Sequence, residues 1–328
     1  MNFPGKVRQS LELALTRLGV AVIPALPRRA VVHLAGFFGG LAWLFSRHLR
    51  RTGRANLDIA FGDSLAAVRK QQILRQSFSS FALVMLDMFW FSRDPENRIR
   101  KYVRFDESYE MLKRKEPKIC LTAHLGNWEL LGKAASFYGA PMVSVAAPLA
   151  NPALDSLFNS MRGNTGQTVV SKGGAIRKLM QTLRDGGNIA VLLDQNTKPA
   201  RGGIFVDYFG LPVPVSSAAA TLYLHTKARI LFSCCLPEPG GYYRTLPILE
   251  ITPPDTTGME KDEAVLTITQ AVAKATEQAV REYPGNWLWM YKRWKYHAPG
   301  ADASRYPFYS KELLPEDRRD VSAEEKEQ

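Results

Sequence analysis

Short β-branched and apolar runs alternate with helical segments through most of this chain, and this alternation limits the possible folds more than any other feature. The expected strands are 118–123, 142–146, 167–170, 188–193, 230–236 and 243–251. The expected helices are 65–91, 128–138, 153–162, 175–185, 216–227 and 262–282. Strands that alternate with helices are typical of parallel sheets. The sequence therefore predicts an α/β fold, with a mixed, mostly parallel sheet flanked by helices.

One strand-to-helix corner holds the strongest candidate for chemistry. His124 directly follows the run 118–123, and Asn127 is a good N-cap, so the next helix is expected to begin at Trp128. Glu129 then lies in the first turn, where the positive end of the helix dipole favours an ionised carboxylate. A histidine at the carboxyl end of a strand, oriented by a carboxylate, can remove a proton from a hydroxyl. His124 is therefore the predicted general base, and Glu129 its orienting partner.

The sequence His-Leu-Gly-Asn-Trp-Glu at 124–129 resembles the signature of the lipid A biosynthesis (late) acyltransferases, within the lysophospholipid acyltransferase superfamily. Other stretches also resemble this family: Arg54 with Asn56-Leu57, 151–162, Asp194-Gln195, 203–210 and 287–295. Two positions depart from its pattern, because Ala147 stands where the family often has arginine and Tyr291 where it often has histidine. The resemblance runs over roughly residues 15–297 and implies an O-acyltransferase that requires no metal and no cofactor.

The resemblance also implies roles for further residues. Arg162 is expected to be catalytic, binding the thioester oxygen or a phosphate, with capping of helix 153–162 as the alternative. Asp194 and Gln195 are expected to orient an acceptor hydroxyl or to clamp the loop after their strand. Three more residues complete the expected substrate-binding set, with aromatic packing beneath exposed cations as the alternative for the last two: Asn127, Arg293 and Lys295.

The expected reaction moves a fatty acyl chain from an acyl carrier protein thioester to a hydroxyl of a phosphorylated glycolipid, with a lipid A precursor as the acceptor that the resemblance favours. Another lipid acceptor, a lysophospholipid or a phosphatidylinositol mannoside, remains open, as does a non-catalytic membrane-binding relative. His124 would deprotonate the hydroxyl for direct attack on the thioester, without an acyl-enzyme. Cys120 has no activating neighbour in the sequence, which argues against a covalent cysteine route.

Positive charge is concentrated near the N-terminus. The net charge is +12, and the first 54 residues contain nine Lys or Arg against one acidic residue, Glu12. Aromatic residues are interspersed with these cations, which fits an anionic membrane surface better than nucleic acid, and an ordinary solvated basic face is the alternative. Between the arginines lies the apolar run 30–45, which as a helix reaches roughly 24 Å against a hydrocarbon core of about 30 Å. An interfacial anchor is therefore expected, with a true membrane span or a buried core helix as alternatives.

The chain is expected to divide into a membrane-anchoring segment (1–54), an acyltransferase domain (55–300) and a polar, flexible tail (301–328). No signal-peptide cleavage pattern follows the apolar run, which favours the cytoplasmic face of a bacterial inner membrane. Neighbouring Cys234 and Cys235 should point to opposite faces of a strand, so a disulfide framework is not expected.

Overall fold

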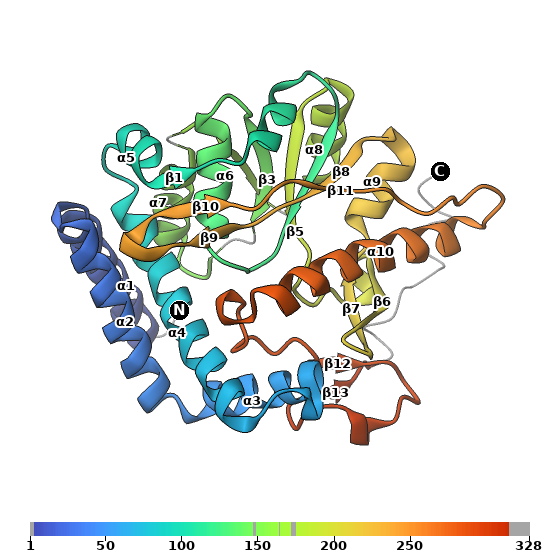
Figure 1. Ribbon diagram of the computed structural model, residues 1–328, viewed down its shortest axis with the longest axis horizontal. Coiled ribbons are helices and arrows are strands. Elements are labelled where there is room, and N and C mark those ends of the chain that lie inside the picture. Colours follow the sequence, from blue (N-terminus) through green and yellow to red (C-terminus); the bar gives the residue numbers. More distant parts are fainter. Residues whose placement is uncertain (1–2, 147–148, 164, 172–174, 315–328) are drawn as a thin grey trace.

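The computed structural model describes residues 3–146, 149–163, 165–171 and 175–314 of the 328-residue chain (Figure 1). Its helices are α1 (Phe3–Val22), α2 (Arg28–Phe45), α3 (Arg47–Phe61), α4 (Ala67–Trp90), α5 (Pro95–Tyr102), α6 (Trp128–Phe137), α7 (Pro152–Gly163), α8 (Ala175–Arg184), α9 (Ala218–Thr226) and α10 (Lys261–Glu282). Its strands are β1 (Val103–Arg104), β2 (Lys118–Thr122), β3 (Met142–Ala146), β4 (Thr168–Ser171), β5 (Asn188–Leu192), β6 (Gly203–Tyr208), β7 (Leu211–Ser216), β8 (Arg229–Phe232), β9 (Cys235–Pro237), β10 (Tyr243–Thr245), β11 (Leu249–Ile251), β12 (Tyr296–His297) and β13 (Lys311–Glu312).

Six strands form the central sheet in the order β11-β8-β2-β5-β3-β4. The pairings from β8 to β4 are parallel, and β11 pairs with β8 in the antiparallel sense. The predicted mixed, mostly parallel sheet is thus confirmed. β2 and β5 are neighbours in this sheet, so the residues that follow them emerge at the same edge.

Two expected strands each divide in the structure. The run 230–236 becomes β8 in the central sheet and β9 in a second, three-stranded sheet, and the run 243–251 becomes β10 and β11 in the same way. The hairpin of β6 and β7 was not predicted, because Pro212 and Pro214 lie within β7. Within the part of the chain that the structure describes, the two strands pair with each other alone, so prolines without an N–H are tolerated there.

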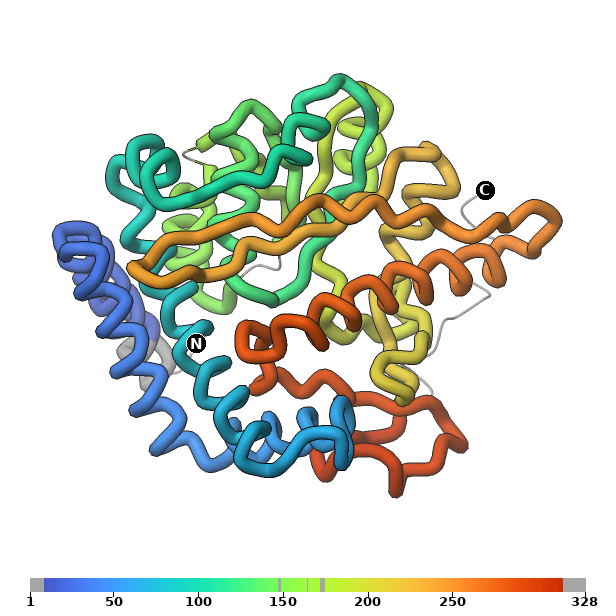
Figure 2. The backbone as a smooth tube through the Cα atoms, in the orientation of Figure 1, coloured from blue at the N-terminus to red at the C-terminus, as the bar shows by residue number. Residues whose placement is uncertain are grey.

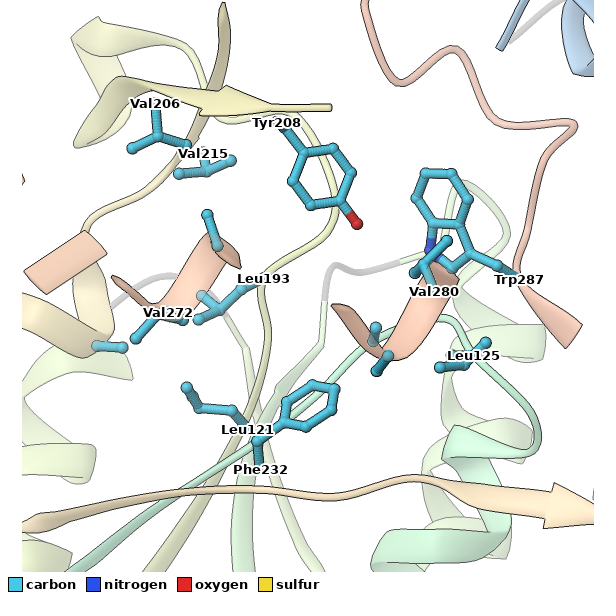
Figure 3. Close-up of a cluster of buried hydrophobic side chains, with 14 of the residues drawn as sticks. Leu121, Leu125, Leu193, Val206, Tyr208, Val215, Phe232, Val272, Val280 and Trp287 are labelled. Atoms are coloured by element: carbon cyan, nitrogen blue, oxygen red, sulfur yellow. The ribbon is translucent and has the colours of Figure 1, made fainter. Parts of the chain in front are cut away.

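Both faces of the sheet are covered. Ile119 and Leu121 of β2 belong to the largest buried cluster, whereas Cys120 between them packs against a separate cluster that includes Ala135 of α6. Figure 3 shows how the largest cluster joins the sheet to other elements: Phe232 comes from the sheet, Val272 from α10, and further side chains from the β6–β7 hairpin. Burial of alternate side chains on opposite faces is what a helix-covered parallel sheet requires.

The N-terminal helices pack against the rest of the chain through α4. α2 lies along α4 (Figure 2), where Val31 and Ala35 are buried and Gly39 permits close backbone contact. A Cβ on Gly39 would lie 2.6 Å from the Cα of Ser79, which explains why glycine is needed there. α3 runs across the expected domain boundary at residue 54.

The other face of α2 and one face of α1 expose apolar side chains. On α2 these are Phe37, Phe38, Leu41, Leu44 and Phe45, and on α1 they are Leu11, Leu15, Leu18 and Val22. Phe45 is 77% exposed. Within the part of the chain described, no single helix has the length and apolarity to cross a bilayer, although α2 together with 47–64, bent by 92°, passes that test as a pair.

The first part of the expected tail is packed. Residues 311–312 form β13 beside β12, Leu313 is 2% exposed, and the Tyr309 hydroxyl donates to Asn56 Oδ1 of α3. Figure 2 shows this segment running beside α3. The prediction that the tail is unstructured from residue 301 is therefore wrong for 301–314, and residues 315–328 lie outside the described chain.

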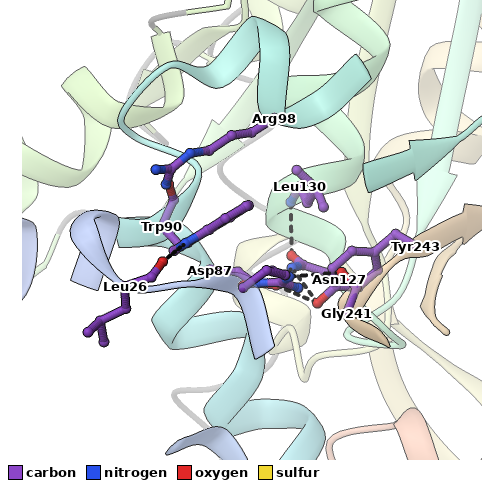
Figure 4. A network of polar contacts seen from close by, with 9 residues as sticks. Leu26, Asp87, Trp90, Arg98, Asn127, Leu130, Gly241 and Tyr243 are labelled. Carbon is purple, nitrogen blue, oxygen red and sulfur yellow. Dashed lines mark hydrogen bonds and ion pairs between the residues drawn. The ribbon is translucent and has the colours of Figure 1, made fainter. Parts of the chain in front are cut away.

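Arg28 was expected to be one of the cations that flank the apolar run and face the membrane. The structure contradicts this expectation. Arg28 is 4% exposed and forms a bidentate ion pair with Asp87 of α4, with Nη2 3.1 Å from Oδ2. Its Nε donates to the carbonyl of Gly241 (2.8 Å), and Figure 4 shows the resulting network. The Asp87 carboxylate also accepts from Asn127 Nδ2 (3.1 Å) and from the Tyr243 hydroxyl. One buried carboxylate therefore joins α2, α4, α6 and β10.

We expect the substitution Asp87→Asn to lower the free energy of unfolding by about 3 kcal/mol or more, because it leaves the Arg28 cation buried without a counter-charge. Chemical denaturation of the purified protein measures this. The matched control is Asp58→Asn, which removes the exposed partner of Lys70 and should cost about 1 kcal/mol or less. Equal losses in the two variants would contradict the assigned importance of the buried pair.

Candidate active site

His124 lies directly beyond β2, at the carboxyl edge of the sheet, as the sequence predicts. The chain then turns sharply at Gly126, whose φ is +67° and where a Cβ would lie 2.2 Å from the carbonyl oxygen of Cys235. Only glycine fits this position without a shift of the backbone. The Asn127 side chain caps α6 by accepting from the Leu130 N–H at 2.9 Å, so the predicted N-cap is confirmed.

Asp194 is the carboxylate that contacts the His124 ring. Its Oδ1 lies 2.7 Å from Nδ1 of His124, and its Oδ2 accepts both from the His124 backbone N–H (2.8 Å) and from Trp287 Nε1 (2.8 Å). Since an ionised carboxylate only accepts, the Nδ1 proton is on the histidine and the Nε2 lone pair is available. This is the tautomer that a general base needs.

These hydrogen-bond donors keep the Asp194 carboxylate ionised. Its carboxylate is 3% exposed, and burial alone would raise its pKa. The electrostatic interaction with His124 and the hydrogen bonds from His124 and Trp287 outweigh burial, so the pKa of Asp194 lies below its ordinary value. Asp194 therefore stays ionised at neutral pH beside the ring.

Glu129 was predicted to orient the His124 ring, but it contacts Arg162 instead. Both of its oxygens accept from Arg162, with distances of 2.8 Å to Nε and 2.7 Å to Nη2. Glu129 is in the first turn of α6 and Arg162 is near the end of α7, so the pair ties the two helices together. The hydrogen bonds with Glu129 outweigh burial and raise the pKa of Arg162. Glu129 as the orienting partner of His124 is thus a wrong prediction, because a bidentate guanidinium occupies the carboxylate.

Lys133 follows one turn after Glu129 on α6 and was not predicted from the sequence. It is 5% exposed, and burial lowers its pKa to about 8, against the opposing effect of the Glu129 charge. A small cavity is lined by Lys133, Glu129 and Arg162 together with the apolar side chains of Met88, Phe91, Leu130 and Met161. The i, i+4 spacing of Glu129 and Lys133 could have predicted that the two side chains lie on the same face of the helix.

Gln195 adjoins the reactive edge of the ring. Its exposed amide nitrogen lies 3.0 Å from His124 Nε2 and can donate to the lone pair there. The next residue, Asn196, donates from its backbone and its side chain to the Tyr291 hydroxyl, each at 3.0 Å. Tyr291, which departs from the family pattern, therefore fixes the loop that contains Gln195. The other departure, Ala147, lies outside the described residues.

Besides Asp194, two more of the predicted substrate-binding residues are buried. Asn127 is 1% exposed, and both ends of its amide bond to other protein groups, so it is a structural cap. Arg293 is 1% exposed and cannot contact a lipid phosphate at the surface. Burial lowers its pKa, its guanidinium stacks 4.8 Å from the Tyr208 ring, and its Nε and Nη1 have no hydrogen-bond partner within the described structure. Lys295 remains partly exposed, over the ring of Tyr296.

Trp287 is a second site residue that the sequence did not predict. The sequence placed it within an aromatic block, and nothing in its spacing showed that its indole N–H donates to a carboxylate 93 residues away. The β-bridge between Leu125 and Trp287 brings the two segments together.

Known proteins share this sequence pattern. A family profile described as bacterial lipid A biosynthesis acyltransferase matches residues 6–296. The lipid A biosynthesis myristoyltransferase of Escherichia coli (strain K12) is 25% identical over 301 residues, covering 90% of this chain and 89% of the relative. The phosphatidylinositol mannoside acyltransferase of Mycobacterium tuberculosis (strain CDC 1551 / Oshkosh) is 28% identical over 174 residues, which is 52% of each chain, so this chain spans about half the length of that relative.

Among solved structures, the 1-acyl-sn-glycerophosphate acyltransferase of Thermotoga maritima overlaps 80% of this chain and 99% of its own, with a TM-score of 0.36 and 12% identity. The family profile covers nearly the whole chain, including His124, Asp194 and Trp287. The chain belongs to the bacterial lipid A biosynthesis acyltransferase family.

Proposed function

We propose that this protein is an O-acyltransferase that moves a fatty acyl chain from an acyl carrier protein thioester to a hydroxyl of a phosphorylated glycolipid, with a lipid A precursor as acceptor. The observation that carries the proposal is the His124–Asp194 pair at the carboxyl edge of the sheet, with Nε2 of the ring facing the exposed Gln195 amide. A base of this kind suits a hydroxyl nucleophile. The family to which the chain belongs indicates that the reaction is an acyl transfer.

In the proposed reaction, Nε2 of His124 takes the proton of the acceptor hydroxyl while the hydroxyl oxygen attacks the thioester carbonyl. The acceptor displaces the Gln195 amide, which occupies that edge of the ring. Asp194 stabilises the imidazolium, which then gives its proton to the sulfur of the departing thiol. The reaction needs no acyl-enzyme, and burial raises the pKa of Cys120 to about 12, so this thiol is a poor nucleophile.

Arg162 is proposed to assist at the oxyanion. Its contacts with Glu129 and Asn159 use three of its five N–H groups, so two N–H donors have no partner among the described residues and are proposed to bind a ligand. Glu129 in this scheme positions Arg162 rather than His124. Donors held in place before the reaction stabilise developing negative charge without reorganisation.

The acceptor is tested by mass spectrometry of total lipids from cells with and without the gene. Loss of one acyl chain from lipid A supports the proposal. Loss from a lysophospholipid-derived lipid or a phosphatidylinositol mannoside would redirect it to the other acceptors, of which the second is the substrate class named for the mycobacterial relative. A full set of acyl chains in every lipid class would support a non-catalytic role.

We expect His124→Ala to lower transfer by a factor on the order of 10²–10⁴ with little change in melting temperature, because the ring supplies general-base catalysis and is partly exposed. The control is His225→Ala, which removes an exposed histidine on α9 whose Nδ1 contacts the carbonyl of Thr221 in the same helix. Transfer rates and thermal melting of both variants are compared with the parent. Normal turnover in folded His124→Ala would exclude the mechanism.

We expect Asp194→Asn to reduce kcat on the order of 10⁴-fold while the fold is retained, because the histidine is locked in the wrong tautomer. Two donors converge on Oδ2, so the amide oxygen must take that place and the NH₂ group must face Nδ1. Nδ1 then accepts, the proton moves to Nε2, and the base is lost. Single-turnover kinetics measure the effect.

Glu129→Gln is the matched carboxylate-to-amide comparison for this prediction. It leaves the His124 tautomer unchanged, so its loss in kcat should be smaller than that of Asp194→Asn. The reverse order would return the orienting role to Glu129.

The protein is further proposed to act at the cytoplasmic face of a bacterial inner membrane. The exposed apolar faces of α1 and α2 would enter the interface, and the exposed cations Arg29, Arg47 and Arg51 would attract anionic lipid. Arg50 contributes less, because its guanidinium caps the carbonyls of Trp43 and Leu44 at the end of α2.

We expect the triple substitution of Phe37, Leu44 and Phe45 to Asn to weaken vesicle binding at all salt concentrations, since each buried side chain contributes about 1.5–3 kcal/mol. Replacing Arg29, Arg47 and Arg51 by Gln should weaken binding mainly to anionic vesicles at low salt, by about 1 kcal/mol per charge. Flotation measures both variants. Leu249 and Leu266, which are exposed on β11 and α10, are the control positions for Asn substitution. Unchanged flotation of the α2 variant would exclude this interface.

A further inference from the structure

The Gln195 side chain covers the reactive edge of the proposed base. Its amide nitrogen lies 3.0 Å from His124 Nε2, whereas Asp194 Oδ1 lies 2.7 Å from Nδ1 of the same ring. Because the ionised carboxylate holds the proton on Nδ1, Nε2 has only a lone pair, and the N–H group of the Gln195 amide is the part that can face it. The hydrogen bond from Gln195 therefore occupies the lone pair that would take the proton of a hydroxyl.

Both neighbours of Gln195 in the chain are fixed. The Asp194 carboxylate accepts three hydrogen bonds. Asn196 donates to the Tyr291 hydroxyl from its backbone and its side chain, each at 3.0 Å, and its side chain also donates to the Lys292 carbonyl at 2.9 Å. The backbone at Gln195 is thus held on both sides, whereas its side chain is exposed. Rotation of this side chain alone would uncover Nε2, without a movement of the loop.

Tyr291 is in turn held from α3. Asn56 is 0% exposed, and its side-chain amide donates to the carbonyls of Trp289 and Tyr291, at 2.7 Å each. Its Oδ1 accepts from the Tyr309 hydroxyl. A chain of hydrogen bonds therefore runs from α3 through Tyr291 to the loop that covers the base. This gives a position-holding role to Asn56, which lies in one of the stretches that resemble the family.

A base at this position has a competing substrate. Water carries the same O–H group as the acceptor, so a base that removes a proton from a hydroxyl can also remove one from water. The water oxygen would attack the thioester carbonyl, the carbon–sulfur bond would break, and the proton on Nε2 would pass to the departing sulfur, which gives a free fatty acid and a thiol. The His124 side chain is 15% exposed. An uncovered Nε2 would thus lead to hydrolysis of the donor, which active sites prevent by excluding water.

We propose that Gln195 is a specificity-determining residue, whose amide covers Nε2 of His124 against water until the bound acceptor displaces it. The inference rests on the proposed function and specifies how one base distinguishes a glycolipid hydroxyl from water. The acceptor compensates for the lost Gln195 hydrogen bond through contacts elsewhere along its length, whereas a water molecule has no such contacts. Tyr291 is the positioning residue that keeps Gln195 over the ring.

The first test measures the release of free fatty acid from an acyl carrier protein thioester by the full-length enzyme in mixed micelles, without any acceptor. The net strength of one ordinary hydrogen bond corresponds to a factor of roughly 2 to 10 in an equilibrium constant, so we expect Gln195→Ala to release fatty acid faster than the parent by about that factor. When a lipid A precursor is added, the ratio of transfer to hydrolysis should fall by a similar factor.

The matched control is Gln181→Ala. Gln181 is an exposed glutamine on α8 whose amide nitrogen donates to Asp185 at 2.9 Å. We expect this variant to hydrolyse the thioester at the parent rate. The double variant of Gln195→Ala with His124→Ala should lose the additional hydrolysis, because that hydrolysis depends on the uncovered base.

Tyr291→Phe tests the positioning role. It removes the hydroxyl that accepts from Asn196 and retains the ring. We expect a rate of hydrolysis between those of the parent and of Gln195→Ala, and a lower ratio of transfer to hydrolysis than in the parent. A purely structural role would lower both rates together and leave their ratio unchanged.

Covalent labelling tests the site without turnover. A neutral imidazole nitrogen attacks diethyl pyrocarbonate through its lone pair, so labelling of His124, read by mass spectrometry, reports whether Nε2 is covered. We expect labelling in Gln195→Ala to be faster than in the parent by about 2 to 10 times. His225, exposed on α9, is the internal reference in both proteins.

Three results would each overturn the inference. The first is a parent rate of hydrolysis or of His124 labelling in Gln195→Ala. The second is an equal increase of hydrolysis in Gln181→Ala. The third is an increase that persists when His124 is also replaced. The proposed function fails separately, if the parent transfers an acyl chain to no glycolipid, and the labelling rates still decide the inference in that case.

Discussion

The buried carboxylate of Asp194 fixes the position of the proposed catalytic base. Its three donors, at 2.7 to 2.8 Å, come from the corner after β2 and from the segment after α10. A buried charge is tolerated only when such donors surround it, so the carboxylate holds three distant parts of the chain in one arrangement. The geometry at His124 consequently depends on Trp287, more than 160 residues away along the chain. This explains why the C-terminal segment belongs to the active site although it contains no proposed base.

A second buried carboxylate, Asp87, fixes the end of the turn between β2 and α6. Asp87 accepts from Asn127, which caps α6, and it also pairs with Arg28 of α2. The short stretch 124–127 is therefore held by Asp194 at its first residue and by Asp87 at its last. Hydrogen bonds to charged groups are directional, whereas apolar packing is not, so this arrangement restricts the orientation of the ring as well as its position. It also links the helix with the exposed apolar face directly to the catalytic corner.

The central sheet was predictable because its evidence is local. Apolar runs and helical periodicity identified β2, β3 and β5 within a residue or two, and the Asn127 cap depends on a bond to a residue only three positions away. The His124–Asp194 pair spans 70 residues and depends on β2 and β5 being neighbours, which no spacing reveals. Arg293 was misassigned for a related reason: a cation in a polar stretch reads as exposed, whereas the structure buries it against Tyr208.

His124 and Glu129 belong to one sequence motif, but in the structure each pairs with a different residue. His124 contacts Asp194, and Glu129 contacts Arg162. If Glu129 oriented the ring, Arg162 would lose the carboxylate that binds two of its nitrogens, and Asp194 would lose the ring. With the observed pairing, His124 and Arg162 each have their own carboxylate. Lys133, with a pKa of about 8, adds a third basic group one turn further along α6. In the proposed mechanism, Arg162 and Lys133 would together stabilise an anion such as a thioester oxyanion. Separation of the two pairs would, in the same proposed mechanism, allow proton transfer at His124 without disturbing the cation that stabilises the negative charge.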